Sequence, residues 1–246
     1  MAQQFYVSPE QVMKDRADFA RKGIARGKSV VVLIYRDGMA LVAENPSPTL
    51  HKIGEIYDRI AFAAVGKYNE FESLRQAGVR YADVRGYSYD RVDVTARGLA
   101  SVYAQSLGSV FTAEQKPFEV ELAVAEVGQR QGEDHIFRLN FDGSISDESG
   151  FLAMGGKADL VQAELEHLWS TGATLDKALR WAVTALEAPR AAVPAAGAGT
   201  AQPLLANTLE VAILDRTPAQ SSGSFRSFRR LTPNDIAREL SQDSSP

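Results

Sequence analysis

The chain has 246 residues and a formal net charge of −4. Hydrophobic residues make up 45% of it and charged residues 24%, which is typical of a globular protein with one sizeable core. It offers neither the roughly 20-residue apolar run of a membrane span nor the apolar core of a secretory signal, so we expect a cytoplasmic protein without membrane contacts. The lack of cysteine excludes disulfides and thiolate metal sites, and the negative charge argues against nucleic acid as a partner.

The first predicted element is an amphipathic helix. Ser8 is a good N-cap, Pro9 suits the first helical position, and Gln11 completes a capping box. Gly23 and Gly27 mark the end of this helix.

After this helix, β-branched runs predict strands, and apolar residues at helical spacing predict helices. In chain order we expect strands at 29–35, 39–44, 52–57 and 60–65, helices at 68–81 and 94–111, strands at 118–127, 135–140 and 151–154, helices at 158–169 and 174–186, strands at 209–214 and 225–231, and a short helix opened by Thr232.

The chain is predicted to form one main domain over residues 9–240. Residues 189–203 are rich in Ala, Gly and Pro and predict a flexible insertion, and residues 241–246 predict a disordered tail. Runs of strands separated by pairs of helices favour a layered α+β fold, with two sheets packed between two helical layers, over an alternating βαβ fold.

Familiar catalytic and cofactor motifs are missing. His51, His135 and His167 are not at metal-ligand spacing, and the sequence has neither a nucleophile elbow nor a glycine-rich nucleotide loop, so we expect no metal and no cofactor. The turn at 154–157 could present backbone N–H groups to an anion, but a tight strand-to-helix turn is the better interpretation. The alternation of aromatic and basic residues over 225–230 could stack bases, but an edge strand makes the same pattern.

Lys52 stands out because it follows a proline-rich loop at the start of a predicted strand. A lysine at the mouth of a strand is usually only solvated, yet it can also receive a carboxylate. The pattern alone does not decide between these interpretations.

An ordered series of motifs resembles the α subunits of the proteasome core particle, and the actinobacterial type in particular. The matching stretches are SPEQ at 8–11, ARKGIARGKSV at 20–30, VAENPS at 42–47, KIGEIYDR at 52–59, GKYNEF at 66–71, RGYSYD at 85–90, YAQ at 103–105, KPFEVEL at 116–122 and DGSI at 142–145.

The resemblance implies the αββα sandwich of N-terminal-nucleophile hydrolases with an added N-terminal helix. It also implies a ring of seven α subunits stacked on catalytic β subunits. Catalytic members of the family begin with a threonine whose amine acts as the base, whereas the corresponding position here is Lys28-Ser29. The catalytic aspartate falls near Glu44 and a supporting serine near Gly156, so we expect this chain to have no peptidase activity of its own.

The remaining roles that the resemblance implies are docking and gating. Lys52 matches the lysine that receives the C-terminal carboxylate of an activator or ATPase tail, and Gly66 matches a second position of that pocket, where the missing side chain leaves room. The segment ahead of the helix would close the axial pore against unfolded or tagged substrate proteins. This gate segment comprises Met1, Ala2, Gln3, Gln4, Phe5, Tyr6, Val7 and Ser8.

Two alternatives remain open from the sequence. The chain could be an autoprocessed hydrolase of the same fold with Ser29 as its nucleophile. It could also be a stand-alone binding module that uses the basic stretch at 225–230.

Overall fold

The computed structural model describes residues 8–191, 203–217 and 226–241. Its first helix, α1 (Pro9–Ile24), begins where Ser8 Oγ accepts the backbone N–H of Gln11 at 3.2 Å, which confirms the predicted N-cap. Only half of the capping box forms among these residues, because the Gln11 side chain donates to Asp15 at 2.6 Å instead of returning to Ser8.

One antiparallel sheet, which we call sheet A, combines strands from both ends of the chain. Its centre is the predicted hairpin, turned by Arg36 and Asp37, and segments far apart in the sequence flank that hairpin. In spatial order the strands are β10 (Phe228–Arg230), β9 (Leu209–Asp215), β2 (Gly38–Glu44), β1 (Val30–Tyr35) and β8 (Phe151–Met154).

The second antiparallel sheet, sheet B, is a meander in which strands adjacent in sequence are adjacent in space. Its strands are β3 (Ile53–Tyr57), β4 (Ile60–Gly66), β5 (Val120–Glu126), β6 (His135–Leu139) and β7 (Ile145–Glu148).

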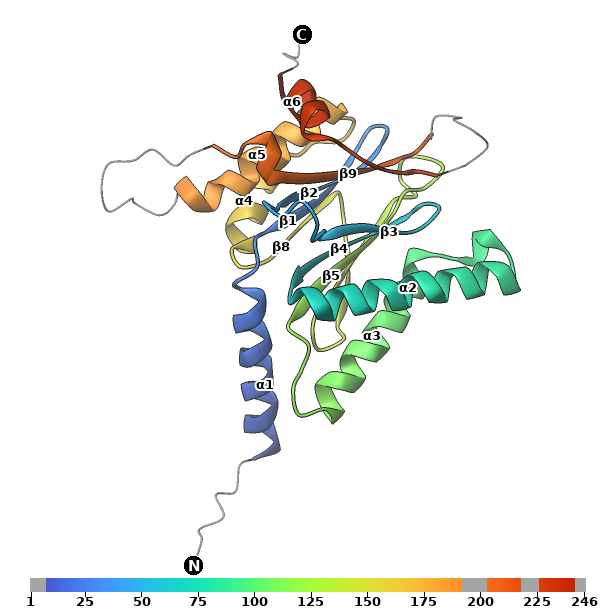
Figure 1. The fold of residues 1–246 in the computed structure, drawn as a ribbon, viewed down its shortest axis with the longest axis vertical. Helices are drawn as coiled ribbons and strands as arrows, with labels where there is room; N and C mark the ends of the chain where they lie inside the picture. Colours follow the sequence, from blue (N-terminus) through green and yellow to red (C-terminus); the bar gives the residue numbers. More distant parts are fainter. Residues whose placement is uncertain (1–7, 192–202, 218–225, 242–246) are drawn as a thin grey trace, which may run out of the picture.

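Two pairs of helices cover the outer faces of the sheets (Figure 1). Sheet B carries α2 (Tyr68–Ser88) and α3 (Ala96–Ala113), which are joined by the 3₁₀ turn η1 (Arg91–Asp93). Sheet A carries α4 (Ala158–Leu168) and α5 (Leu175–Ala191). The turn η2 (Ala206–Thr208) precedes β9, and α6 (Pro233–Ser241) packs against α5. The predicted α+β sandwich of two sheets between two helical layers, with an added N-terminal helix, is therefore confirmed.

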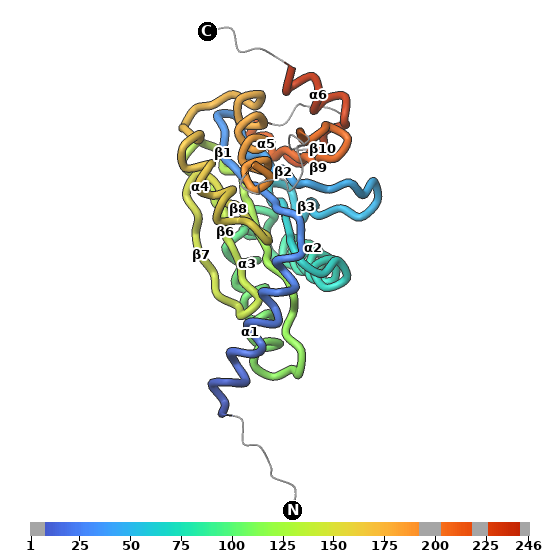
Figure 2. Tube along the Cα trace, turned by 90° about the vertical axis from the view of Figure 1, so that its left-hand side faces the viewer, coloured from blue at the N-terminus to red at the C-terminus, as the bar shows by residue number. Residues whose placement is uncertain are grey.

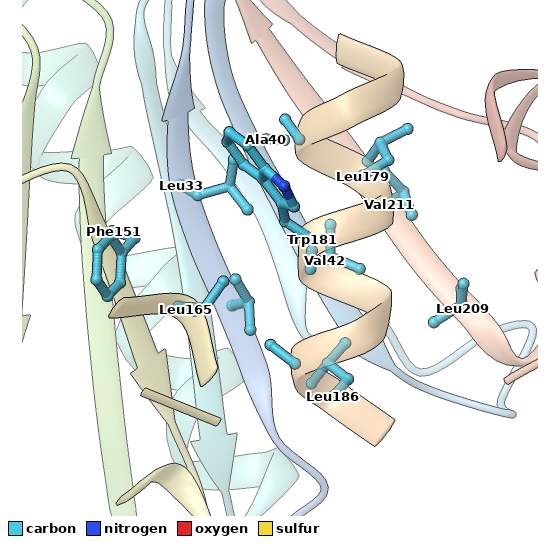
Figure 3. Close-up of a cluster of buried hydrophobic side chains, with 14 of the residues drawn as sticks. Leu33, Ala40, Val42, Phe151, Leu165, Leu179, Trp181, Leu186, Leu209 and Val211 are labelled. Carbon is cyan, nitrogen blue, oxygen red and sulfur yellow. The ribbon is translucent and has the colours of Figure 1, made fainter. Parts of the chain in front are cut away.

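Three buried apolar layers hold these elements together. On the outer face of sheet A, Leu179 and Leu186 of α5 pack over Leu33, Val42 and Val211 (Figure 3). On the outer face of sheet B, the side chains of α2 and α3 pack over the strands. Between the sheets many of the buried residues are alanines, whose short side chains let the two layers approach closely; they are Ala43, Ala61, Ala63, Ala123, Ala125 and Ala212.

Several predicted boundaries are wrong. The helix expected to end at residue 81 continues to Ser88, because Ala82 is buried against the same layer and extends its apolar face. The strand β7 was not predicted, since three of its four side chains are exposed and it has no apolar face. Pro189, placed in the flexible insertion, is buried within the last turn of α5, and Ser241, placed in the tail, ends α6. The rest of the insertion up to residue 202, and residues 242–246, lie outside the described residues.

The N-terminal half of α1 points away from the two sheets (Figures 1 and 2). Arg16 ties the helix to the end of α3 by donating to the carbonyls of Phe111 at 2.8 Å and Thr112 at 3.0 Å. Val12 and Phe19 remain 36% and 46% exposed on the outer surface of α1. This helix therefore offers apolar surface that the described part of the chain leaves uncovered.

Candidate functional site

Lys52 lies at the junction of the two sheets, immediately before β3. Its carbonyl accepts the N–H of Ala64 at 3.0 Å, and its ammonium donates to the carbonyls of Lys28 at 2.8 Å and Glu44 at 3.3 Å. The side chain thus reaches from sheet B to the start of β1 and the end of β2.

The surroundings of this amine disfavour its charged form. Burial lowers the pKa of Lys52 to about 8, and the nearby Lys28 acts in the same direction, while Glu210 and Glu44 oppose the shift. An ammonium has three N–H donors, of which the two carbonyls take two. Among the described residues the third donor has no acceptor, so it is the one that could bind a carboxylate.

The backbone at Lys52 is held by a buried carboxylate on β9. Glu210 Oε2 accepts the N–H of Lys52 at 2.9 Å, and Oε1 accepts the N–H of Ile53 at 3.2 Å. The same carboxylate accepts Asn45 Nδ2 at 2.7 Å and is paired with Arg230. Sequence reasoning missed Glu210, although one acidic residue within the apolar run 209–214 is a signal that a buried charge must have partners.

Gly66, the other predicted pocket residue, ends β4 next to the same junction. Its φ is +115°, and a Cβ placed on it would lie 1.9 Å from the carbonyl oxygen of Glu119. A side chain at position 66 would therefore meet the protein's own backbone, which is a physical reason for glycine there, and the contact of Gly66 with an activator tail stays a prediction. Gly27, next to Lys28, packs against Gly66, since a Cβ on Gly27 would lie 3.2 Å from the Gly66 nitrogen.

The linker between α1 and β1 passes through this junction as continuous, closely packed chain. A Cβ on Gly156 would lie 2.1 Å from the carbonyl oxygen of Ala25, and one on Gly155 would lie 3.0 Å from Cα of Ser29. Glu44 faces the same linker and pairs with Lys28 at 3.0 Å. The structure thus brings together Lys28, Ser29, Glu44 and Gly156, the positions at which the resemblance places the catalytic groups of other members.

The turn at Gly155-Gly156 is a strand-to-helix turn whose N–H groups are already used. The N–H of Gly155 donates to the buried Glu121 carboxylate at 3.2 Å, and that of Gly156 donates to the carbonyl of Gly27 at 3.4 Å. Burial raises the pKa of Glu121, and Arg138 opposes the shift. The interpretation as a tight turn, rather than as a cradle for an external anion, is the one that these contacts favour.

The basic stretch near the C-terminus forms an edge strand, as its preferred interpretation predicts. Within this stretch β10 pairs with β9, and the arginines at 226, 229 and 230 each meet a carboxylate of this chain. Arg226 pairs with Glu55, Arg229 with Asp215 and Arg230 with Glu210. These pairings remove the main argument for a nucleic-acid-binding module.

The three histidines do not form a site together. His51 Nδ1 lies 3.3 Å from Glu210, and His135 stacks on Phe137. Within residues 8–191, 203–217 and 226–241, no group of three or more His, Asp or Glu side chains is arranged to hold a metal ion. Of the predicted gate segment, only Ser8 is described, as the N-cap of α1; Met1 to Val7 lie outside the described residues.

Comparisons with known proteins agree with this architecture. The family model described as Proteasome subunit matches residues 24–199. The chain is 68% identical to "Proteasome subunit alpha" of Renibacterium salmoninarum over 241 residues, which cover 98% of this chain and 96% of that one. It is also 68% identical to the protein of the same name from Pseudarthrobacter chlorophenolicus over 240 residues, 98% and 100% of the two chains. The more distant protein of that name from Thermomonospora curvata is 56% identical over 242 residues, 98% and 99% of the two chains.

In the part of the chain that the structure describes, no helix combines the length and the apolar character needed to cross a bilayer.

The contact at Gly66 predicts a clear stability difference between two glycines of positive φ. Gly66→Ala adds a Cβ that meets the Glu119 carbonyl, whereas Gly132→Ala, at φ +101°, adds one with nothing within 4 Å. Both substitutions should cost about 1–2 kcal/mol for the backbone conformation, and Gly66→Ala about 1–3 kcal/mol more for the forced contact. Urea unfolding measures both values, and equal losses would contradict the contact.

Proposed function

The chain belongs to the proteasome subunit family and to its actinobacterial alpha type, and from that premise we propose that it is a non-catalytic subunit of the outer ring of the core particle. In this role it would assemble with copies of itself, seven to a ring, and with catalytic β subunits in the cytoplasm. It would close the entrance to the proteolytic chamber with residues 1–8 and receive the C-terminal tails of a ring-forming ATPase or other activator. The substrates would be unfolded or tagged proteins.

The observation that carries the docking proposal is the geometry of Lys52. Its ammonium donates to two carbonyls, and within the described part of the chain its third donor has no partner, which leaves it for a ligand. A charge-assisted hydrogen bond from this donor to a tail carboxylate would contribute about 1.5–3 kcal/mol. Several such contacts on one activator would raise the overall affinity strongly.

The lack of a catalytic role is supported by the chemistry at the start of β1. The position that corresponds to the family's nucleophile holds Lys28-Ser29 and no threonine, and the carboxylate of Glu44 pairs with the amine of Lys28 at 3.0 Å. The linker ahead of Lys28 packs against Gly66 and Gly156, which argues against its removal to expose Ser29. An intact mass that begins at Met1 or Ala2 would exclude the autoprocessed alternative, and a mature chain beginning at Ser29 would revive it.

Ring formation is supported by the exposed apolar surface of α1. Val12, Met13 and Phe19 are each at least 36% exposed on a helix that extends away from the sandwich (Figure 1). Packing this surface against a neighbouring copy would remove it from water. Size-exclusion chromatography after co-expression with the β subunit tests this assembly, and a chain that stays monomeric with its β partner would contradict it.

Replacement of the docking lysine should disable activation without preventing assembly. Lys52→Ala removes the ammonium, so we expect activator-stimulated protein degradation to fall by at least about tenfold, from the loss of 1.5–3 kcal/mol per tail. Lys177→Ala, on the outer helix α5, is the matched control and should retain stimulation. Stimulation that survives in Lys52→Ala would refute the docking site.

Docking should also depend on pH, because the pKa of Lys52 is lowered to about 8. The amine is charged below that pH and neutral above it. The affinity for a tail peptide with a free carboxylate should therefore be constant below about pH 7 and fall by about tenfold per pH unit above pH 8, until the pKa of the complex is reached. Fluorescence anisotropy measures this profile, with a C-terminally amidated peptide as control. Constant affinity through pH 9 would contradict the assignment.

Removal of the proposed gate should open the particle. Deleting Met1 to Ser8 should raise the basal cleavage of a short fluorogenic peptide by the assembled particle, because the deletion takes away the segment proposed to close the pore. Ser8→Ala, which removes only the N-cap of α1, controls for helix stability, and removal of 242–246 controls for truncation as such. Basal cleavage that stays at the wild-type level would place the gate elsewhere.

A further inference from the structure

Glu210 connects three separate segments to the point where the chain reaches Lys52. The carboxylate belongs to β9 of sheet A, and its side chain is 6% exposed. It accepts the consecutive backbone N–H groups of Lys52 and Ile53, the side-chain amide of Asn45, and the charged group of Arg230, and it lies 3.3 Å from His51 Nδ1. A single buried carboxylate therefore fixes the loop before β3 from its first residue to its last.

With these bonds, every polar group of Lys52 has a hydrogen-bond partner among the described residues except the third N–H of its ammonium. Its N–H is held by Glu210, its C=O by the N–H of Ala64, and two of its ammonium donors by the carbonyls of Lys28 and Glu44. The direction of the remaining ammonium donor is set by these four contacts. Of the four, only the one to Glu210 comes from a side chain.

From this arrangement we propose that Glu210 is a positioning residue of the tail-docking site: it aims the Lys52 ammonium at the incoming carboxylate and keeps that ammonium charged. The inference rests on the proposed docking function of Lys52. It adds to that function a residue that does not touch the tail.

Besides accepting these hydrogen bonds, Glu210 acts through its negative charge on the protonation of Lys52. Lys52 is faced by Glu210 from β9, by Glu44 from β2 and by Lys28 from the linker, and Glu210 is the strongest of the groups that favour the charged amine. Arg230 and His51 adjoin Glu210 itself, and Arg190 adjoins Glu44. Neutralising Glu210 therefore removes the main charge that offsets the burial of the amine.

The chain contains a control residue, Glu121, that tests whether the role of Glu210 is purely structural. Glu121 on β5 is also 6% exposed, is paired with Arg138, and accepts a backbone N–H from Gly155. Glu121 is not among the groups whose charges shift the pKa of Lys52. Glu121→Gln thus reproduces the cost of neutralising a buried, paired carboxylate without acting on Lys52.

The test uses the assembled particle of α and β chains and a synthetic peptide of the last eight residues of the cognate ring-forming ATPase. The peptide is prepared as the free acid and as the C-terminal amide, and its affinity is measured from pH 6.5 to 9.5. In Glu210→Gln we expect the pH midpoint for binding of the free acid to move down by about one unit, which weakens binding about threefold at pH 7.5 and about tenfold at pH 9. Binding of the amide should change little, because it brings no carboxylate.

Further variants separate the two roles of Glu210. Glu210→Asp keeps the charge but withdraws it by one methylene from the Lys52 and Ile53 amides, so the affinity should fall while the midpoint stays near that of the wild type. This variant also provides the measurement if Glu210→Gln does not assemble. Glu121→Gln should keep both the affinity and the midpoint.

The outcomes distinguish this inference from the function on which it rests. If Lys52→Met binds the free acid as tightly as the wild type, the docking function itself is wrong. If Lys52→Met loses binding while Glu210→Gln keeps the wild-type affinity and midpoint, only the positioning role is wrong. If Glu121→Gln shifts the midpoint as far as Glu210→Gln, the effect is general destabilisation and the inference fails.

Discussion

Close backbone packing around the linker between α1 and β1 is the constraint on which the rest of the site depends. Within the linker, Gly27 lies against the backbone of Gly66 on β4, and Ala25 lies against Gly156 in the turn before α4, so closely that a Cβ on Gly156 would meet the Ala25 carbonyl. The linker is therefore held where the carbonyl of Lys28 meets the amine of Lys52. The same constraint fixes the point from which α1 leaves the sandwich (Figure 2).

The site lies at the junction of the two sheets, where polar side chains reach from one sheet to the other beside a core that is otherwise apolar. Lys52 reaches from sheet B to backbone carbonyls at the start of β1 and the end of β2, and Glu210 reaches back from sheet A to amides of sheet B. Each buried charge is paired or hydrogen-bonded, which keeps its desolvation affordable. Among the described residues, the Lys52 ammonium uses two of its three donors on these carbonyls, and the third is the one that the proposed docking would use.

Much of the fold was predictable because strong local signals agree with tertiary packing. The hairpin of β1 and β2 has a continuous apolar run on each side of a short turn, and the caps of α1 and α6 involve Ser8 and Thr232 as expected. β7 was not predictable, because its exposed side chains carry no periodic signal.

At the site, Lys52 was found through the family resemblance, whereas Glu210 is separated from it by 158 residues and meets it only through strand pairing in three dimensions. The reason for glycine at position 66 also depends on a contact with Glu119 that no local pattern indicates.

The topology of the two sheets has a consequence for how the chain is made. All five strands of sheet B lie between Ile53 and Glu148 and pair in sequence order, so this half can form from contiguous chain as it leaves the ribosome. Sheet A must wait, because β2 pairs with β9, which ends at Asp215. Until then the alanine-lined face of sheet B lacks its contacts with Ala212 and Leu214 of β9, so part of its apolar surface is uncovered. Such a subunit has an interval in which chaperones can bind it, and that interval ends when β9 pairs with β2 inside sheet A.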